Sequence, residues 1–151
     1  MAFRLFRFKT ILTAFALAVV LAAGLAAPAD AQSIDPSTQT AIESVISDQI
    51  AAFRADDGAL AYSFAAPSIQ RIFPDPDRFM AMVREGYQPV YRPRDFRFAR
   101  IEAVGGEIVQ EVDIVGPDGK DWIAVYSLKQ QEDGSWKITG CVLKEPEGLG
   151  V

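Results

Sequence analysis

The sequence contains no histidine and a single cysteine, and these two scarcities exclude several kinds of site. Ser-His-Asp and Cys-His catalytic arrangements cannot be built, and neither can a histidine general base. A zinc site of the usual Cys/His type is excluded too, because one cysteine supplies too few ligands. Cys141 also cannot form a disulfide within the chain. Stability must therefore come from the apolar core, for which 50% hydrophobic residues are available.

Basic residues are fewer than acidic ones, 15 against 20, which gives a formal net charge of −5. Such a charge disfavours nucleic acid and anionic membrane surfaces as partners. The carboxylates of Asp75-Pro76-Asp77 are too few for a calcium loop. The turn "GPDGKD" lacks the glycine spacing and the following helix of a phosphate-binding loop. We therefore expect no nucleic-acid partner, no metal and no organic cofactor.

The start of the chain has the order of an export signal. Three basic residues come first, Arg4, Arg7 and Lys9. An uncharged stretch from Ile11 to Ala27 follows, and then Ala29-Asp30-Ala31, a pattern that signal peptidase accepts. This predicts a signal peptide over residues 1–31, cleavage between Ala31 and Gln32, and a periplasmic or secreted protein. An uncleaved membrane anchor is the alternative, and it would make the leader the only membrane contact.

After the leader, the chain has the length of one domain. We expect a short lead-in over residues 32–36, a single domain over 37–145 and a flexible tail over 146–151. Apolar residues recur at helical spacing in the first half of this domain. They predict one helix from Asp35-Pro36 to about residue 54, a short second helix ending before Pro67, and a third after Asp75-Pro76. Pro89 and Pro93 then predict extended backbone.

The second half of the domain changes to an alternating pattern, typical of strands. Four strands are predicted, over residues 95–104, 107–115, 120–129 and 135–143, with glycine-rich turns between them. Connections this short make neighbouring strands antiparallel. The sequence thus predicts an α+β fold, with three N-terminal helices packed on a curved four-stranded antiparallel sheet.

Four segments resemble a known family: "VISDQIAAFRADD", "FAAPSIQRIF", "RFMAMVREGY" and "WKITGCVL", in this order over residues 40–143. The family is domain of unknown function 4864, small exported proteobacterial proteins. The resemblance implies an architecture similar to the nuclear-transport-factor-2-like superfamily, a cone of helices and sheet that often encloses a pocket. It supports export but implies no activity. Because the superfamily includes enzymes, binding modules and dimerisation domains, only a site can decide between functions.

An arginine-rich segment is the sharpest feature of the sequence. Residues 71–100 hold seven arginines and four acidic residues, a local charge of +3 in an acidic chain. An arginine fork with tyrosine hydroxyls suits a small anionic or carboxylate ligand. The plainer interpretation, which we favour, is that the arginines form surface ion pairs and the tyrosines close the core. The best candidates for a ligand-binding group that converges on one concave pocket are Arg71, Tyr87, Tyr91, Gln110 and Tyr126.

These observations favour a non-catalytic module of the cell envelope that binds a small ligand or another protein. One alternative is a cofactor-free enzyme of isomerase, lyase or hydrolase type. It would use a tyrosine and an aspartate, Asp56 or Asp57, in the pocket of the cone. A second alternative is a purely structural dimerisation domain. A homodimer would use the outer face of the sheet, where Ile123 and Val125 lie among polar neighbours.

Overall fold

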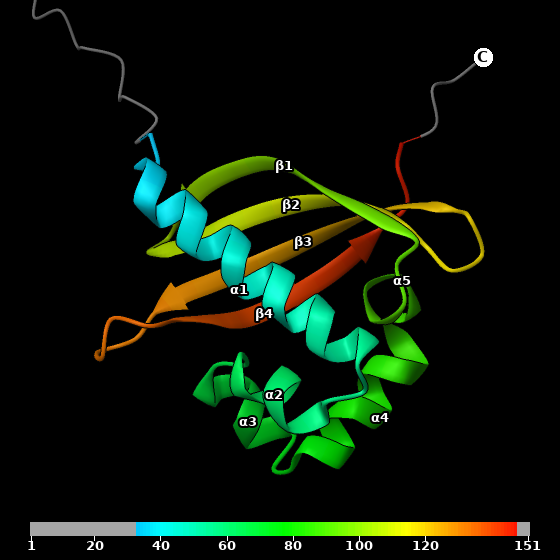
Figure 1. Cartoon of the computed structure of the whole chain (residues 1–151). Coiled ribbons are helices and arrows are strands. Elements are labelled where there is room, and N and C mark those ends of the chain that lie inside the picture. Colours follow the sequence, from blue (N-terminus) through cyan, green and yellow to red (C-terminus); the bar gives the residue numbers. More distant parts are fainter. Residues whose placement is uncertain (1–32, 148–151) are drawn as a thin grey trace, which may run out of the picture. The chain divides into compact units, whose positions relative to one another are not determined.

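The computed structural model describes residues 33–147, so the predicted signal peptide lies outside the described residues. These residues form helices α1 (Pro36–Arg54), α2 (Gly58–Ser63), α3 (Pro67–Ile72), α4 (Pro76–Gly86) and α5 (Gln88–Tyr91), followed by strands β1 (Asp95–Val104), β2 (Glu107–Val115), β3 (Asp121–Gln130) and β4 (Trp136–Lys144). Figure 1 shows α1 lying across the sheet and the shorter helices gathered at one end. Within residues 33–147, no helix has the length and apolarity needed to cross a membrane.

Aspartate side chains cap the N-termini of α1, α2 and α4. The Asp-Pro pairs in the sequence predict this for α1 and α4. The Asp35 carboxylate accepts hydrogen bonds from the backbone N–H groups of Ser37 and Thr38, both at 3.0 Å. Asp75 accepts one from Arg78 at 2.9 Å, and Asp57 one from Leu60 at 3.0 Å. These side chains pair N–H groups that have no partner inside the helix, and so they fix where each helix begins.

The structure has two short helices that the sequence analysis does not predict, α3 and α5. Each has a proline in its first turn, Pro67 in α3 and Pro89 in α5. A proline is well suited to that position, because the N–H it lacks would have no helical partner there. The expected extended backbone around Pro89 is therefore wrong: residues 88–91 form one helical turn.

The four predicted strands are confirmed to within one residue at each end. They pair antiparallel in the order β1-β2-β3-β4, as short hairpins require. The turns contain Gly105, Gly119 and Gly134 at φ values of +58°, +81° and +83°. Only glycine adopts this left-handed region freely, so these residues set the positions of the hairpins. The predicted α+β class, with helices on a curved four-stranded sheet, is confirmed.

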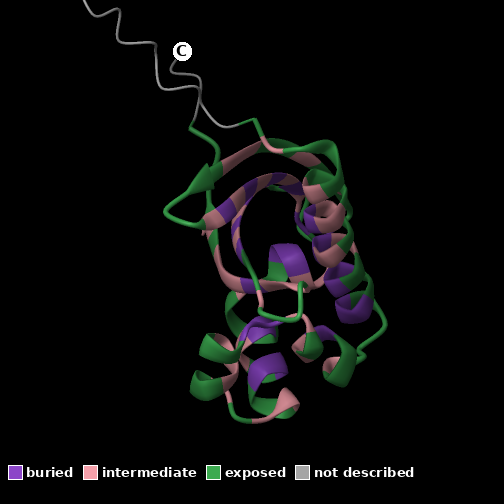
Figure 2. Cartoon of the chain, turned by 90° about the vertical axis from the view of Figure 1, so that its left-hand side faces the viewer, coloured by how far each residue is buried: buried purple, intermediate pink, exposed green. Residues whose placement is uncertain are grey.

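Two irregularities bend the sheet. The register of β1 on β2 shifts between Phe98 and Ile101, and that of β3 on β4 shifts between Ser127 and Leu128. Such bulges increase the local twist and curvature of a sheet. Figure 2 shows the resulting curl, with α1 lying against the inner side. Ile42, Ile46 and Ile50 of α1 are fully buried there, together with inward-facing residues of the strands.

The connection between α2 and α3 forms backbone hydrogen bonds with β4, at the edge of the sheet. The backbone N–H of Ala66 donates to the carbonyl of Ile138 at 2.8 Å, and the N–H of Ile138 donates to the carbonyl of Phe64 at 2.9 Å. Residues 64–66 thus run beside β4 like a fragment of a fifth strand. This connection places α3 and α4 beyond the edge of β4, next to the inner side of the sheet.

Candidate functional site

A half-open pocket of about 310 Å³, here called the inner pocket, lies between the helices and the concave side of the sheet. Both layers contribute to it: α1, α3, α4 and α5 from one side, β3 and β4 from the other. Apolar side chains form most of the wall, among them Phe53, Ile69, Phe73, Phe79, Met82 and Val83. The pocket can therefore enclose an apolar molecule of modest size.

A cluster of aromatic rings makes the helical wall of the inner pocket. Phe79 of α4 lies at its centre, with its ring centroid 6.3 Å from those of Phe53 and Phe73 and 5.6 Å from that of Tyr62. Tyr62 is held in turn, because its hydroxyl donates to the carbonyl of Phe73 at 2.6 Å. These contacts hold the shape of the wall in place.

Four polar side chains reach the inner pocket, and two of them have protein partners. The Gln49 amide donates to the carbonyl of Ala61 at 3.2 Å, and the Tyr87 hydroxyl donates to the carbonyl of Cys141 at 3.2 Å. The hydroxyls of Tyr126 and Thr139 are buried and have no hydrogen-bond partner of good geometry. Buried hydroxyls nearly always have a partner, so two unpaired hydroxyls among the residues of one pocket are unusual.

The inner pocket is uncharged. Among residues 33–147, those that line it include no aspartate, glutamate, lysine or arginine. Cys141 pairs with Tyr126 across β3 and β4, and burial raises the pKa of its thiol to about 12. Burial also raises the pKa of Tyr126 well above its usual range and raises that of Tyr87. All three side chains are therefore neutral near pH 7.

The structure brings together two of the five predicted ligand-binding residues. Tyr87, at the end of α4, and Tyr126, on β3, both line the inner pocket. Arg71, Tyr91 and Gln110 do not. The prediction that all five converge on one concave site is therefore wrong.

Gln110 faces the concave side of the sheet, as predicted, but its partner is the backbone. Its side chain is fully buried, and its amide donates to the carbonyls of Arg100 at 3.2 Å and Glu111 at 2.8 Å. The first of these contacts lies at the bulge of β1. The N–H groups of the amide thus stabilise an irregular strand, while its Oε1 is buried without a hydrogen-bond partner.

Arg71 lies on the other side of the sheet from Gln110. It lines a shallow depression together with Glu107, Ser127 and Lys129, which alternate along β2 and β3 with inward-facing residues. Arg71 lies there because residues 67–72 form helix α3, which the sequence does not predict. Residues two positions apart point to different sides of a helix, so Ile69 lines the pocket while Arg71 is exposed.

Tyr91 belongs to a surface cluster, here called the Asp56 latch, formed by Asp56, Arg84, Tyr91 and Arg92. The Tyr91 hydroxyl donates to the Asp56 carboxylate, and the guanidinium of Arg92 lies 2.7 Å from the same carboxylate. Arg92 also stacks on the Tyr91 ring, 3.9 Å from its centroid. The latch joins the turn after α1 to α5. Arginine pairing at the surface, the favoured interpretation of this segment, is confirmed here.

Neither Asp56 nor Asp57 can serve as a base in the inner pocket. Asp57 caps α2, and Asp56 is held in the latch with its side chain 53% exposed. The hydrogen bond from Tyr91, followed by the one from Arg92, lowers the pKa of Asp56, so this carboxylate is a weaker base than a free one. The enzyme alternative that pairs an aspartate with a tyrosine in the pocket is therefore wrong.

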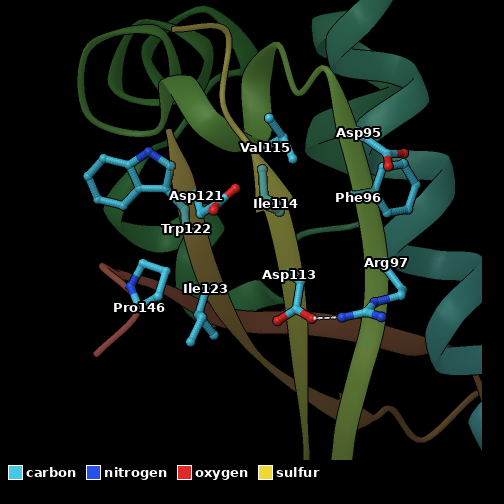
Figure 3. Close-up of a pocket in the computed structure, with 10 residues that line it drawn as sticks. All are labelled: Asp95, Phe96, Arg97, Asp113, Ile114, Val115, Asp121, Trp122, Ile123 and Pro146. Carbon is cyan, nitrogen blue, oxygen red and sulfur yellow. Dashed lines mark hydrogen bonds and ion pairs between the residues drawn. The ribbon is translucent and has the colours of Figure 1, made fainter. Parts of the chain in front are cut away.

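A second depression, of about 500 Å³, lies at the end of the sheet (Figure 3). It is lined by Asp95, Asp113 and Asp121, but Asp113 pairs with Arg97 at 2.6 Å between β2 and β1. Across residues 33–147, no three acidic, cysteine or histidine side chains come close enough together to hold a metal ion. The depression contains one buried polar group without a partner, the indole N–H of Trp122, and its acidic side chains do not converge on a metal site.

The fold and the inner pocket define a class: a small α+β protein whose helices and curved sheet enclose an uncharged pocket. The chain belongs to the family described as domain of unknown function (DUF4864), which matches residues 36–151 and confirms the predicted family.

Two solved structures are similar to the chain, and the titles of both describe NTF2-like proteins of unknown function. The first, from Shewanella baltica OS155, has 15% sequence identity and a TM-score of 0.49, and the match covers 74% of this chain and 96% of that one. The second, from Burkholderia xenovorans LB400, has 15% identity and a TM-score of 0.47, with coverage of 74% and 89%. No protein with a curated description matches the chain.

Proposed function

We propose that this protein is a non-catalytic binding module that takes up a small organic molecule in the inner pocket. The observation that carries this proposal is a space of about 310 Å³ between the two layers of the fold, lined mainly by apolar side chains from both. Ligand pockets in proteins have volumes of roughly 300–1,000 Å³ and the same apolar character.

The packing around the inner pocket supports the proposal. Protein interiors are normally close-packed, and an apolar space left unfilled costs stability. Here the aromatic wall around Phe79 and the hydrogen bond from Tyr87 to β4 hold the space open. A ligand that fills it would regain the missing contacts, whereas a defect of packing would close by small shifts of side chains.

A location in the cell envelope rests on the leader, whose basic, apolar and Ala-x-Ala parts occur in the order of an export signal. We expect a chain that begins at Gln32, found by mass spectrometry of the periplasmic fraction. A full-length chain that stays with the inner membrane would contradict cleavage and favour the anchor.

Binding in the inner pocket is tested with a fluorescent dye and one substitution. N-phenylnaphthylamine is uncharged and fluoresces strongly in apolar surroundings. We expect it to bind the full-length chain and to raise its melting temperature, because a ligand of the folded state stabilises that state. Ile69→Trp places a larger side chain in the pocket and should abolish binding.

Ile72→Trp is the matched control. It makes the same change in the same helix, at a position that is 71% exposed and outside the pocket, and should leave binding unchanged. The proposal is overturned if the wild-type chain does not bind the dye, or if Ile69→Trp binds it as tightly as the wild type.

A further inference from the structure

We propose that the inner pocket selects an amphipathic ligand whose polar group is uncharged and hydrogen-bonds to the hydroxyls of Tyr126 and Thr139. This inference rests on the proposed binding function and adds the chemical class of the ligand. It replaces the anionic or carboxylate ligand that the arginine-rich segment first suggested.

The Tyr126 hydroxyl is the main observation. Tyr126 is 1% exposed, faces the concave side of β3 and lines the inner pocket. Its hydroxyl has no hydrogen-bond partner of good geometry, although the Cys141 thiol, a weak donor and acceptor, lies beside it. Because folded proteins rarely leave a buried hydroxyl unpaired, a hydroxyl at the wall of a pocket points to a ligand that completes it.

Thr139 lies at the bulge in β4, the strand next to that of Tyr126. In the ladder with β3, Leu128 pairs with Ile138 and Ser127 with Gly140, so Thr139 is the extra residue between them. Regular alternation after the inward-facing Ile138 would turn Thr139 outward. Bulges often redirect a side chain next to a binding site. Here Thr139 lines the inner pocket and also the depression that contains Arg71, and its buried hydroxyl is the second one without a partner.

The absence of charge around these two hydroxyls selects against ions. No acidic or basic residue among those described lines the pocket, and burial keeps the Cys141 thiol neutral. Arg84 and Arg92, which could have balanced a carboxylate, are engaged by Asp56 at the surface. An ionised ligand would lose its hydration without gaining a counter-charge. An alcohol, carbonyl or amide matches two hydroxyls that can each donate and accept.

A matched series of probes tests this selectivity at neutral pH: propylbenzene, phenylpropanol, phenylpropanoate and phenylpropylamine, each titrated calorimetrically against the full-length chain. They share the phenylpropyl group and differ in the polar group. We expect the carboxylate and the ammonium ion to bind at least about ten-fold more weakly than the alcohol. Equal affinity for the alcohol and either ion would overturn the inference.

Substitution of Tyr126 shows whether its hydroxyl makes the contact. Tyr126→Phe keeps the ring and should weaken phenylpropanol binding roughly three- to ten-fold, with propylbenzene binding unchanged. The melting temperature should fall little, because the hydroxyl loses at most a weak contact with the Cys141 thiol. Thr139→Val removes the second hydroxyl, on β4, and should also weaken phenylpropanol binding. It provides the test if Tyr126→Phe does not fold. If both variants bind phenylpropanol as tightly as the wild type, the inference is wrong.

Tyr91→Phe is the control, since it removes a hydroxyl that donates to Asp56 in the latch and lies outside the lining of the pocket. It should lower the melting temperature but keep the wild-type affinities. The two proposals fail differently. If neither the dye nor any probe binds, the binding function itself is refuted. If the dye and propylbenzene bind but the ions bind as tightly as the alcohol, only the selectivity is refuted.

Discussion

The Asp56 latch and the inner pocket use the same kind of side chain in opposite ways. In the latch, the Tyr91 hydroxyl donates to a carboxylate, accepts from Arg84 at 3.3 Å and lies beside a second guanidinium. In the pocket, the Tyr126 hydroxyl is buried and unpaired. Polar groups that lie close together in the sequence thus form hydrogen bonds and ion pairs with one another at the surface. Tyr126 and Thr139, whose hydroxyls lack a partner, lie on separate strands and come to line one pocket only in the folded protein.

Truncation of Phe79, at the centre of the pocket wall, should have the largest effect on the stability of the protein. Phe79 is 4% exposed and packs against three aromatic rings. Phe79→Ala should therefore lower the free energy of unfolding by about 3–5 kcal/mol, as is usual for a buried phenylalanine. Urea denaturation measures this loss. Ile72→Ala, at an exposed position, should change stability by less than about 0.5 kcal/mol. Equal effects of the two substitutions would show that the wall is not part of the core.

Disruption of the Asp56 latch should lower the stability by a smaller amount, and this amount should depend on pH. Hydrogen bonds from Tyr91 and Arg92 lower the pKa of Asp56 from its ordinary value of 3.8. A lowered pKa means that the carboxylate stabilises the folded state at pH values above 3.8. This contribution is lost as the pH falls through the lowered pKa, because the unfolded chain then binds the proton first.

Asp56→Asn should therefore be less stable than the wild type at neutral pH and lose part of this difference in acid, as measured by urea midpoints across the pH range. Asparagine tolerates the φ of +54° at this position, so the comparison isolates the charge. Dye binding in the inner pocket should be unchanged. A constant difference in stability at all pH values would show that the carboxylate charge does not hold the latch.

Much of the fold could be predicted because its signals are local. Asp-Pro pairs start helices, alternating residues form strands and glycines turn the hairpins, and each of these depends on a few neighbouring residues. The missed helices α3 and α5 have six and four residues. Helices this short are not stable alone and form because the rest of the fold holds them. Pro67 and Pro89, interpreted as a helix stop and as extended backbone, are in fact helix starts.

The candidate site could be predicted only in part, for the same reason. Tyr87 is a candidate because it lies in the arginine-rich segment, and Tyr126 because a cone that folds the helices over the sheet could bring this strand residue to the same pocket. Thr139 is missed because alternation after Ile138 places it outward, although Gly140, a glycine inside the strand, is a signal of the bulge. Arg71 was misplaced because its direction depends on the turn of α3. Local charge density is therefore only a partial guide to the site: it marks Tyr87, but charged residues of the same segment pair with one another.

A crystal structure of the full-length chain with phenylpropanol tests the central claim most directly, namely that the unpaired groups of the inner pocket, and not the arginine-rich surface, bind the ligand. We expect the phenyl ring among the apolar residues around Phe79 and the ligand hydroxyl within about 3 Å of the Tyr126 hydroxyl. A structure with the inner pocket closed by side chains, or with the ligand bound at the Asp56 latch, would contradict the claim.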